Sequence, residues 1–161
     1  MPGMFVLARA VTYAALFIGL VLIFLPARIL SSTGIIQPSA IGVWQVAGML
    51  LGVSGAALAL TCILTFAFVG RGTPAPFDPP RRLVVRGPYR LVRNPMYVGA
   101  GLALAGAVLF YQSVALLGYA GLFLIVTHVF VVLYEEPTLR RTFGKDYEAY
   151  CRRAGRWRPK R

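Results

Sequence analysis

Hydrophobic residues in this chain are grouped into four long blocks separated by short polar segments. The first two blocks run from about Val6 to Leu25 and from about Ala40 to Phe68, and the last two from Met96 to Tyr111 and from Val114 to Tyr134. A helix needs about 20 apolar residues to cross a bilayer core. The pattern therefore predicts an all-α integral membrane protein with about four transmembrane helices.

The segments between the blocks predict how the helices connect. Residues 26–40 are expected to form a loop after the first helix. Residues 70–95, in which four prolines between residues 74 and 80 precede a basic run, are expected to form a polar connector. Only Gln112 and Ser113 separate the last two blocks, which predicts an antiparallel hairpin. The glycines and alanines of the third helix would let the fourth approach closely.

Other residues bear on packing and on the C-terminal tail. Gly48 and Gly52 form a GxxxG pair, which favours close helix contact within the bundle or between copies of the chain. Apolar residues recur in the tail at spacings of three and four: Leu139, Phe143, Tyr147, Tyr150 and Cys151. This spacing predicts an amphipathic helix that lies against the membrane face or folds over a site.

Charge is distributed unevenly along the chain. There are 17 basic and five acidic residues, and no acidic residue precedes Asp78. Six basic residues fall between Arg71 and Arg93 and nine between Arg140 and Arg161. Both clusters flank apolar blocks, which indicates contact with anionic membrane lipids rather than with nucleic acid. The sequence thus predicts a cytoplasmic membrane protein with both termini and its charged face in the cytosol.

Few residues could bind a metal. Cys62 and Cys151 form no CxxC pair, and His128 is the single histidine, so no metal site is predicted. His128 lies in the fourth block, seven residues before Glu135, which would place both on one helix face. An ionisable residue within a span is a functional candidate, and here the alternatives are an acceptor-side role and an interhelical hydrogen bond.

Polar side chains gather at two helix ends that the predicted hairpin brings to one membrane face. They are an arginine and two tyrosines before the third helix and a glutamate after the fourth: Arg93, Tyr89, Tyr97 and Glu135. A helix N-terminus and an arginine favour a carboxylate, tyrosine rings favour a cation or an aromatic group, and a glutamate accepts hydrogen bonds from hydroxyls. This set suits S-adenosylmethionine (SAM), a zwitterionic and aromatic cation.

The chain from residue 72 onward resembles the isoprenylcysteine carboxyl methyltransferase family, which groups with the phospholipid methyltransferases. The similarity lies in the order and spacing of Gly87-Pro88-Tyr89, Arg93-Asn94-Pro95-Met96-Tyr97, Glu135-Glu136, Leu139, Phe143-Gly144, Tyr147, Tyr150, Arg156-Trp157 and Pro159. It implies a SAM-dependent integral membrane methyltransferase with a cytosolic, non-Rossmann cofactor site. Its lipophilic substrate would come from the bilayer.

The resemblance also implies site residues and an organisation. Positions that match the family's cofactor-binding positions are Arg81, Leu83, Val84, Tyr89, Asn94, Pro95, Met96, Tyr97 and Glu135. Candidate catalytic residues are His128, Arg93 and Asn94. Residues 1–161 would form one membrane domain, with two N-terminal helices in residues 1–69 and the methyltransferase core in residues 70–161.

Two positions depart from the family pattern. Asn94 stands where the family often has histidine, and an asparagine cannot act as a base near neutral pH. Val131 stands where eukaryotic members carry an arginine suited to a substrate carboxylate. The expected activity is therefore methyl transfer of the isoprenylcysteine carboxylate type, with a phospholipid, a small thiol or a non-catalytic scaffold role as alternatives.

Overall fold

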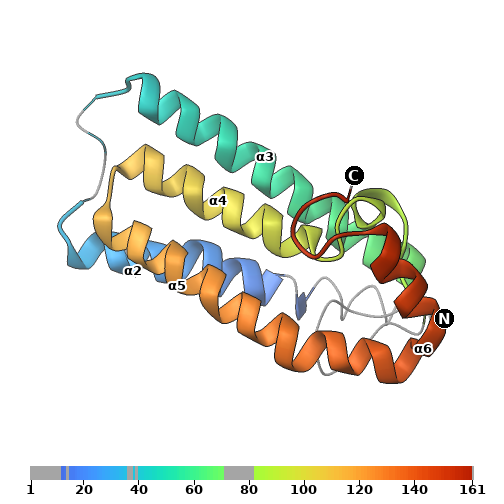
Figure 1. Cartoon of the computed structure of the whole chain (residues 1–161). Helices are drawn as coiled ribbons and strands as arrows, with labels where there is room; N and C mark the ends of the chain where they lie inside the picture. The colour runs from blue at the N-terminus through green and yellow to red at the C-terminus, as the bar shows by residue number, and fades with distance from the viewer. Residues whose placement is uncertain (1–11, 14, 36–37, 39, 71–81, 161) are drawn as a thin grey trace.

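The protein is built from helices throughout the part of the chain that is described. A computed structural model describes residues 12–13, 15–35, 38, 40–70 and 82–160. Its elements are η1 (Ile18–Phe24), α2 (Leu25–Ser32), α3 (Val43–Thr65), η2 (Phe66–Gly70), η3 (Gly87–Arg90), α4 (Pro95–Tyr111), α5 (Val114–Phe130), η4 (Val131–Glu135) and α6 (Glu136–Arg153). The predicted all-α architecture is confirmed for these residues (Figure 1).

Among the described residues, three continuous helices are long and apolar enough to cross a membrane, namely Ala15–Ser32, Val43–Thr65 and Val114–Arg153. The last of them joins α5, η4 and α6, and its membrane-crossing part is the apolar α5. A fourth apolar helix, α4, is shorter than these three. The helices thus agree with an integral membrane protein. Arg9 and the proline-rich part of the connector, residues 74–80, lie outside the described residues.

The first helix continues further than its sequence predicts. The expected loop over residues 26–40 is wrong at its start, because the chain stays helical through Pro26 to Ser32. Pro26 lies within this continuous helix, where the π-helical η1 changes to α2, and such irregularities are usual where a proline interrupts the helical hydrogen bonds. The helix ends before Gly34, whose positive φ of 74° suits glycine.

Helices α3 and α4 pack through their glycines. A Cβ atom added to Gly48 would lie 2.6 Å from the carbonyl oxygen of Gly106, and one added to Gly55 would lie 2.5 Å from that of Gly99. The two backbones therefore touch in an antiparallel register that pairs Gly48 with Gly106 and Gly55 with Gly99. At the far end of this seam, the Gln45 side chain donates to the Phe110 carbonyl at 3.3 Å.

The predicted hairpin forms, and the glycines of α4 serve contacts with both α5 and α3. Gln112 takes a left-handed conformation (φ 49°), and the Ser113 hydroxyl caps α5 by accepting from the Leu116 N–H. Gly99 and Gly106 of α4 face α3, whereas Gly101 faces Leu124 of α5, where an added Cβ would lie 3.2 Å from the leucine side chain. The expectation that small residues bring α5 close is therefore confirmed at Gly101, and the other two glycines serve the contact with α3. Away from their turn, α4 and α5 diverge, as Figure 1 shows. Instead, η1 supports α5, where Tyr119 donates to the Val21 carbonyl at 2.8 Å.

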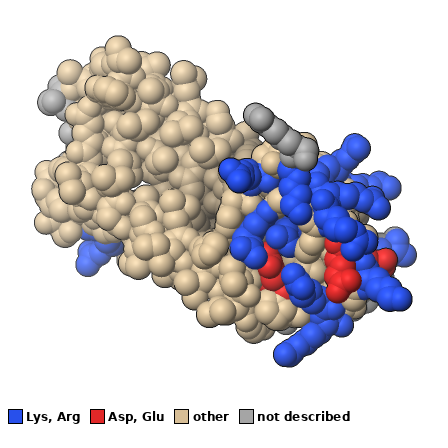
Figure 2. All heavy atoms as spheres, in the orientation of Figure 1, with Lys and Arg blue, Asp and Glu red and all other residues tan. Residues whose placement is uncertain are grey.

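Charged side chains gather at one end of the molecule. Figure 2 shows most Lys and Arg side chains of the visible face there, with the Asp and Glu side chains among them, and a long apolar body beside them. Large apolar side chains remain exposed along the outer faces of α3 and α5, as expected of surfaces that meet lipid: Val43, Leu50, Val53, Leu117, Leu122 and Ile125.

Replacement of Gly106 by alanine should destabilise the α3–α4 pair. The added methyl would lie 2.5 Å from the Gly52 nitrogen, and overpacking of this kind costs about 1–3 kcal/mol. Gly52→Ala is the matched control, because nothing lies within 4 Å of its added Cβ. Thermal unfolding in detergent should show a lower midpoint for Gly106→Ala alone, and equal midpoints for the two variants would contradict the seam.

Candidate functional site

The polar end of α4 meets the polar end of the α5–η4 helix through a tyrosine and a glutamate. Tyr97 lies in the first turn of α4, and its hydroxyl donates to Glu135 Oε2 at 3.3 Å. This contact confirms that the two helix ends come together. Glu135 ends the π-helical η4, and such widened turns are frequent at functional sites.

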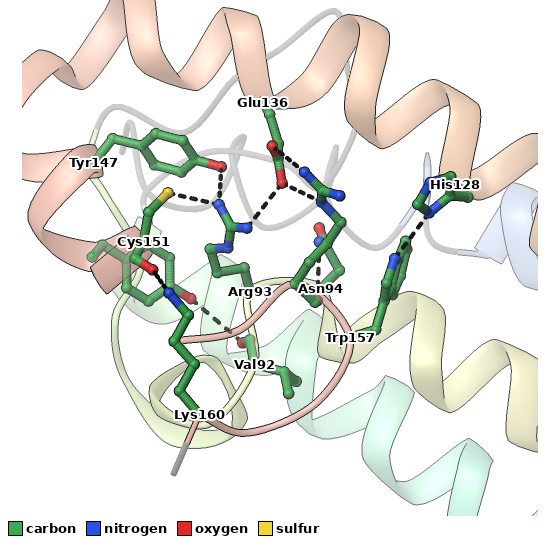
Figure 3. Close-up of polar contacts among 11 residues, drawn as sticks. Val92, Arg93, Asn94, His128, Glu136, Tyr147, Cys151, Trp157 and Lys160 are labelled. Carbon is green, nitrogen blue, oxygen red and sulfur yellow. Dashed lines mark hydrogen bonds and ion pairs between the residues drawn. The ribbon is translucent and has the colours of Figure 1, made fainter. Parts of the chain in front are cut away.

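The next residue, Glu136, is a buried carboxylate paired with two arginines. Its oxygens accept from Arg156 Nε at 2.7 Å and Nη2 at 2.9 Å, and Oε1 lies 3.2 Å from Arg93 Nη2 (Figure 3). Hydrogen bonding to Glu136 also raises the pKa of Arg156 above its ordinary value. One carboxylate thus joins the connector, the start of α6 and the C-terminal residues.

Arg93 makes its contacts with protein groups of α6. Besides Glu136, its Nη1 donates to the Tyr147 hydroxyl at 3.3 Å and lies 2.6 Å from Cys151 Sγ. Its Nε is buried without a hydrogen-bond partner among the described residues. The guanidinium therefore faces the tail, and the predicted bidentate contact with a ligand carboxylate stays a prediction.

Residues 154–160, which we call the C-terminal strap, cross the start of α4. The Arg93 N–H donates to the Gly155 carbonyl at 2.8 Å, and Asn94 Nδ2 donates to the Arg156 carbonyl at 3.3 Å. The Asn94 amide bonds the strap, and α4 begins without a side-chain cap. Trp157 Nε1 then donates to His128 Nδ1 of α5 at 3.1 Å.

The connector packs beneath α6. Tyr89 and Val84 are buried with Cys62 of α3, with Met96 packed against them. The Tyr150 hydroxyl donates to the Tyr89 carbonyl at 2.6 Å. Burial raises the pKa of Tyr89 well above its ordinary value, so this phenol stays neutral.

The apolar side chains of α6 face the connector. Tyr147 and Tyr150 form a buried cluster with Ala154, and the residues packed against it include Leu83, Val85, Leu139, Phe143 and Cys151. Helix α6 therefore packs against the connector, and its predicted placement against the membrane face or over a site stays a prediction. Gly144 kinks the helix with a φ of 50°.

The predicted residues fall into three groups. Tyr97 and Glu135 meet directly, and Arg93 and Asn94 hold the tail. Leu83, Val84, Tyr89, Pro95 and Met96 form the packed floor between connector and helices. Arg81 lies outside the described residues. His128 makes a polar contact with the strap, and η4 replaces the regular α-helical spacing that would put it on the face of Glu135.

Sequence reasoning missed the pairing of Glu136 with Arg156. A signal was present in the composition, because a chain with five acidic and 17 basic residues offers several cations to each carboxylate. A glutamate at the end of an apolar helix is buried only when it is paired. The identity of its partner needed the return of the strap, which residue spacing does not show.

A comparison with known families decides the family. A family model described as phospholipid methyltransferase matches residues 43–146, which run from the start of α3 into α6 and include Arg93, Tyr97, Glu135 and Glu136. The chain belongs to the phospholipid methyltransferase family. Membership makes this helical protein a membrane methyltransferase and agrees with the resemblance in the sequence. Comparisons with curated proteins and with solved structures gave no match.

Replacement of Glu136 by glutamine should loosen the tail of this methyltransferase. The amide would leave Arg93 and Arg156 without a counter-charge at a site where the carboxylate side chain is 8% exposed. The expected loss is about 2–3 kcal/mol, lower than for a fully buried pair because Arg156 is partly exposed.

Thermal unfolding and limited proteolysis of the tail would measure this loss. Glu148→Gln on the exposed side of α6 is the matched control and should behave as wild type. A wild-type midpoint and wild-type protease resistance in Glu136→Gln would show that the ion pairs do not hold the strap.

Proposed function

We propose that this protein transfers the methyl group of SAM to a lipophilic acceptor that reaches the site from the bilayer. The observation that carries the proposal is the Tyr97–Glu135 hydrogen bond, which joins the ends of α4 and η4. Family membership supports the methyl-transfer chemistry. The apolar helices support an acceptor that is soluble in the membrane.

The residues present fit the polar groups of SAM. Glu135 can accept hydrogen bonds from ribose hydroxyls or from the ammonium group. The first turn of α4 has no side-chain cap, so its backbone N–H groups can hold the carboxylate. Tyr97 orients Glu135, and Met96 lies beside it in the same turn. When bound, SAM supplies an electrophilic methyl group on a sulfonium.

Arg93 and Asn94 act in this proposal through the tail. Arg93 places Glu136, and Asn94 places the strap, so both support the residues that touch the cofactor. Asn94 does not titrate near neutral pH, and we assign it no role as a base. Positioning of acceptor and methyl group then provides most of the catalysis, and it suits an acceptor that is anionic or easily deprotonated.

The acceptor is a lipid that carries either a carboxylate or an amine. The isoprenylcysteine-type motifs favour the carboxylate. Val131 favours the amine, because it is a fully buried apolar side chain where a carboxylate-binding arginine would be expected. The phospholipid methyltransferase match also favours the amine of a phospholipid headgroup.

Variants of Tyr97 and Glu135 should weaken SAM binding. Tyr97→Phe removes the hydroxyl that orients the glutamate, and we expect about a fivefold to tenfold rise in the Kd for SAM. Glu135→Gln removes a charged acceptor and should raise the Kd about tenfold or more.

Calorimetry with the purified protein in detergent would measure these constants. Tyr111→Phe at the other end of α4 and Glu148→Gln are matched controls that should bind SAM as wild type. Wild-type protein that binds no SAM would contradict the proposal and leave a scaffold role. Unchanged binding in both site variants would place the cofactor elsewhere.

The charged end of the molecule is proposed to face the cytosol, by the positive-inside rule. A cysteine at Gln112, in the turn at the opposite end, should react with a membrane-impermeant maleimide in intact cells. A cysteine at Arg153 should react only after the cells are permeabilised. Wild-type protein is the control for the native cysteines, Cys62 and Cys151, and the reverse labelling pattern would invert the proposed topology.

A further inference from the structure

Two successive residues of the strap contact two different helices. The Arg156 carbonyl accepts from Asn94 at the start of α4, and the Trp157 indole donates to His128 within α5. The strap thus runs from the start of α4 to α5, two helices that diverge away from their turn (Figure 1). Figure 3 shows Trp157 pointing from the strap toward His128.

The two contacts differ in how firmly they are held. Arg156 is fixed by two hydrogen bonds to the buried Glu136, and the neighbouring Gly155 carbonyl accepts from the Arg93 N–H. The Trp157–His128 hydrogen bond is a single bond at an exposed site. Among the described residues, no other polar contact joins the strap to α5. The Trp157–His128 bond can therefore break while Arg156 keeps the strap in place.

His128 is placed where the lipid-facing surface of α5 meets the strap. It is exposed, and so are its helix neighbours Leu124, Ile125 and Val129. In a bilayer these apolar side chains meet acyl chains, whereas Trp157 sits on the strap beside the start of α4. An indole suits such a boundary, because its ring is apolar and its N–H needs a polar partner.

We propose that Trp157 and His128 form the acceptor-side wall of the site and determine how the lipid acceptor fits. The proposal rests on the proposed function, and it assigns the pair to the acceptor rather than to SAM. His128 Nδ1 holds the indole by accepting its N–H, so His128 is a positioning residue and Trp157 is the residue that meets the lipid. The acceptor passes between α5 and the start of α4 along this ring.

The test uses variants that remove one hydrogen bond from either side. Trp157→Phe keeps an aromatic ring and loses the N–H, and His128→Leu loses the acceptor. His128→Asn keeps an acceptor oxygen near the position of Nδ1 and should rescue the function. Trp44→Phe is the matched control, since Trp44 lies exposed on α3, a different helix.

Labelled methyl transfer from SAM would be measured with the full-length protein in mixed micelles, with phosphatidylethanolamine and an S-farnesylated cysteine as separate acceptor probes. Trp157→Phe and His128→Leu should each raise the acceptor KM about threefold to tenfold, the size expected for one exposed hydrogen bond. The kcat and the Kd for SAM should stay at wild-type values. The double variant should be no worse than either single variant, because both remove the same bond.

Several outcomes would overturn the inference. An unchanged acceptor KM or additive effects in the double variant would show that the pair does not act together on the acceptor. An equal rise in the Kd for SAM would place the pair at the cofactor instead. Wild-type protein that transfers no methyl group to either probe would overturn the proposed function itself. Calorimetry of SAM binding then separates this failure from a failure of the inference about Trp157 and His128.

Tryptophan fluorescence provides a second readout that needs no turnover and no change at His128. The chain has two tryptophans, so Trp157 is the single fluorophore in Trp44→Phe. The lipid to add is whichever of the two acceptor probes the wild-type protein methylates in the transfer assay. With S-adenosylhomocysteine in place of SAM, addition of this lipid should change the Trp157 emission. An emission spectrum that the same lipid leaves unchanged would contradict contact between Trp157 and the acceptor.

Discussion

The buried carboxylate of Glu136 is the interaction on which the arrangement of the charged end depends. A buried carboxylate is costly unless it is paired, and here it is paired with Arg93 from the connector and Arg156 from the strap. Three segments far apart in the sequence are thereby fixed to one another. The backbone that carries Glu136 also carries Glu135, so the ion pairs set where Glu135 meets Tyr97.

The membrane part supplies a closely packed pair of helices, α3 and α4, and a third helix, α5, whose contact with α4 is looser. Without a hydrophobic driving force between helices in lipid, close backbone contact stabilises the bundle, and the glycines of α3 and α4 provide that contact. The start of α4 therefore has a fixed position. Helix α5 diverges from α4 away from their turn. The Tyr97–Glu135 hydrogen bond and the strap join the two helices again at the charged end, where the candidate site lies.

Hydropathy predicted the helices well, because a bilayer imposes length and apolarity on each span. It failed at Pro26, where the change from η1 to α2 accommodates the ring. The glycines of α4 predicted close packing against α5, which holds at Gly101, but not the contact of Gly99 and Gly106 with α3. A small residue shows that a neighbour can approach and not which one does. The meeting of Tyr97 and Glu135 followed from the short turn at Gln112. The pairing of Glu136 with Arg156 depends on how the tail returns, and local patterns carry no information on that.

This membrane protein is proposed to methylate a lipid with SAM at the junction of α4 and η4. Mass spectrometry of a membrane lipid extract incubated with the purified protein and SAM tests it most directly. The account predicts a lipid species that gains one methyl group, and its loss when S-adenosylhomocysteine replaces SAM. An extract in which no lipid gains a methyl group, with folded protein that binds SAM, would contradict it.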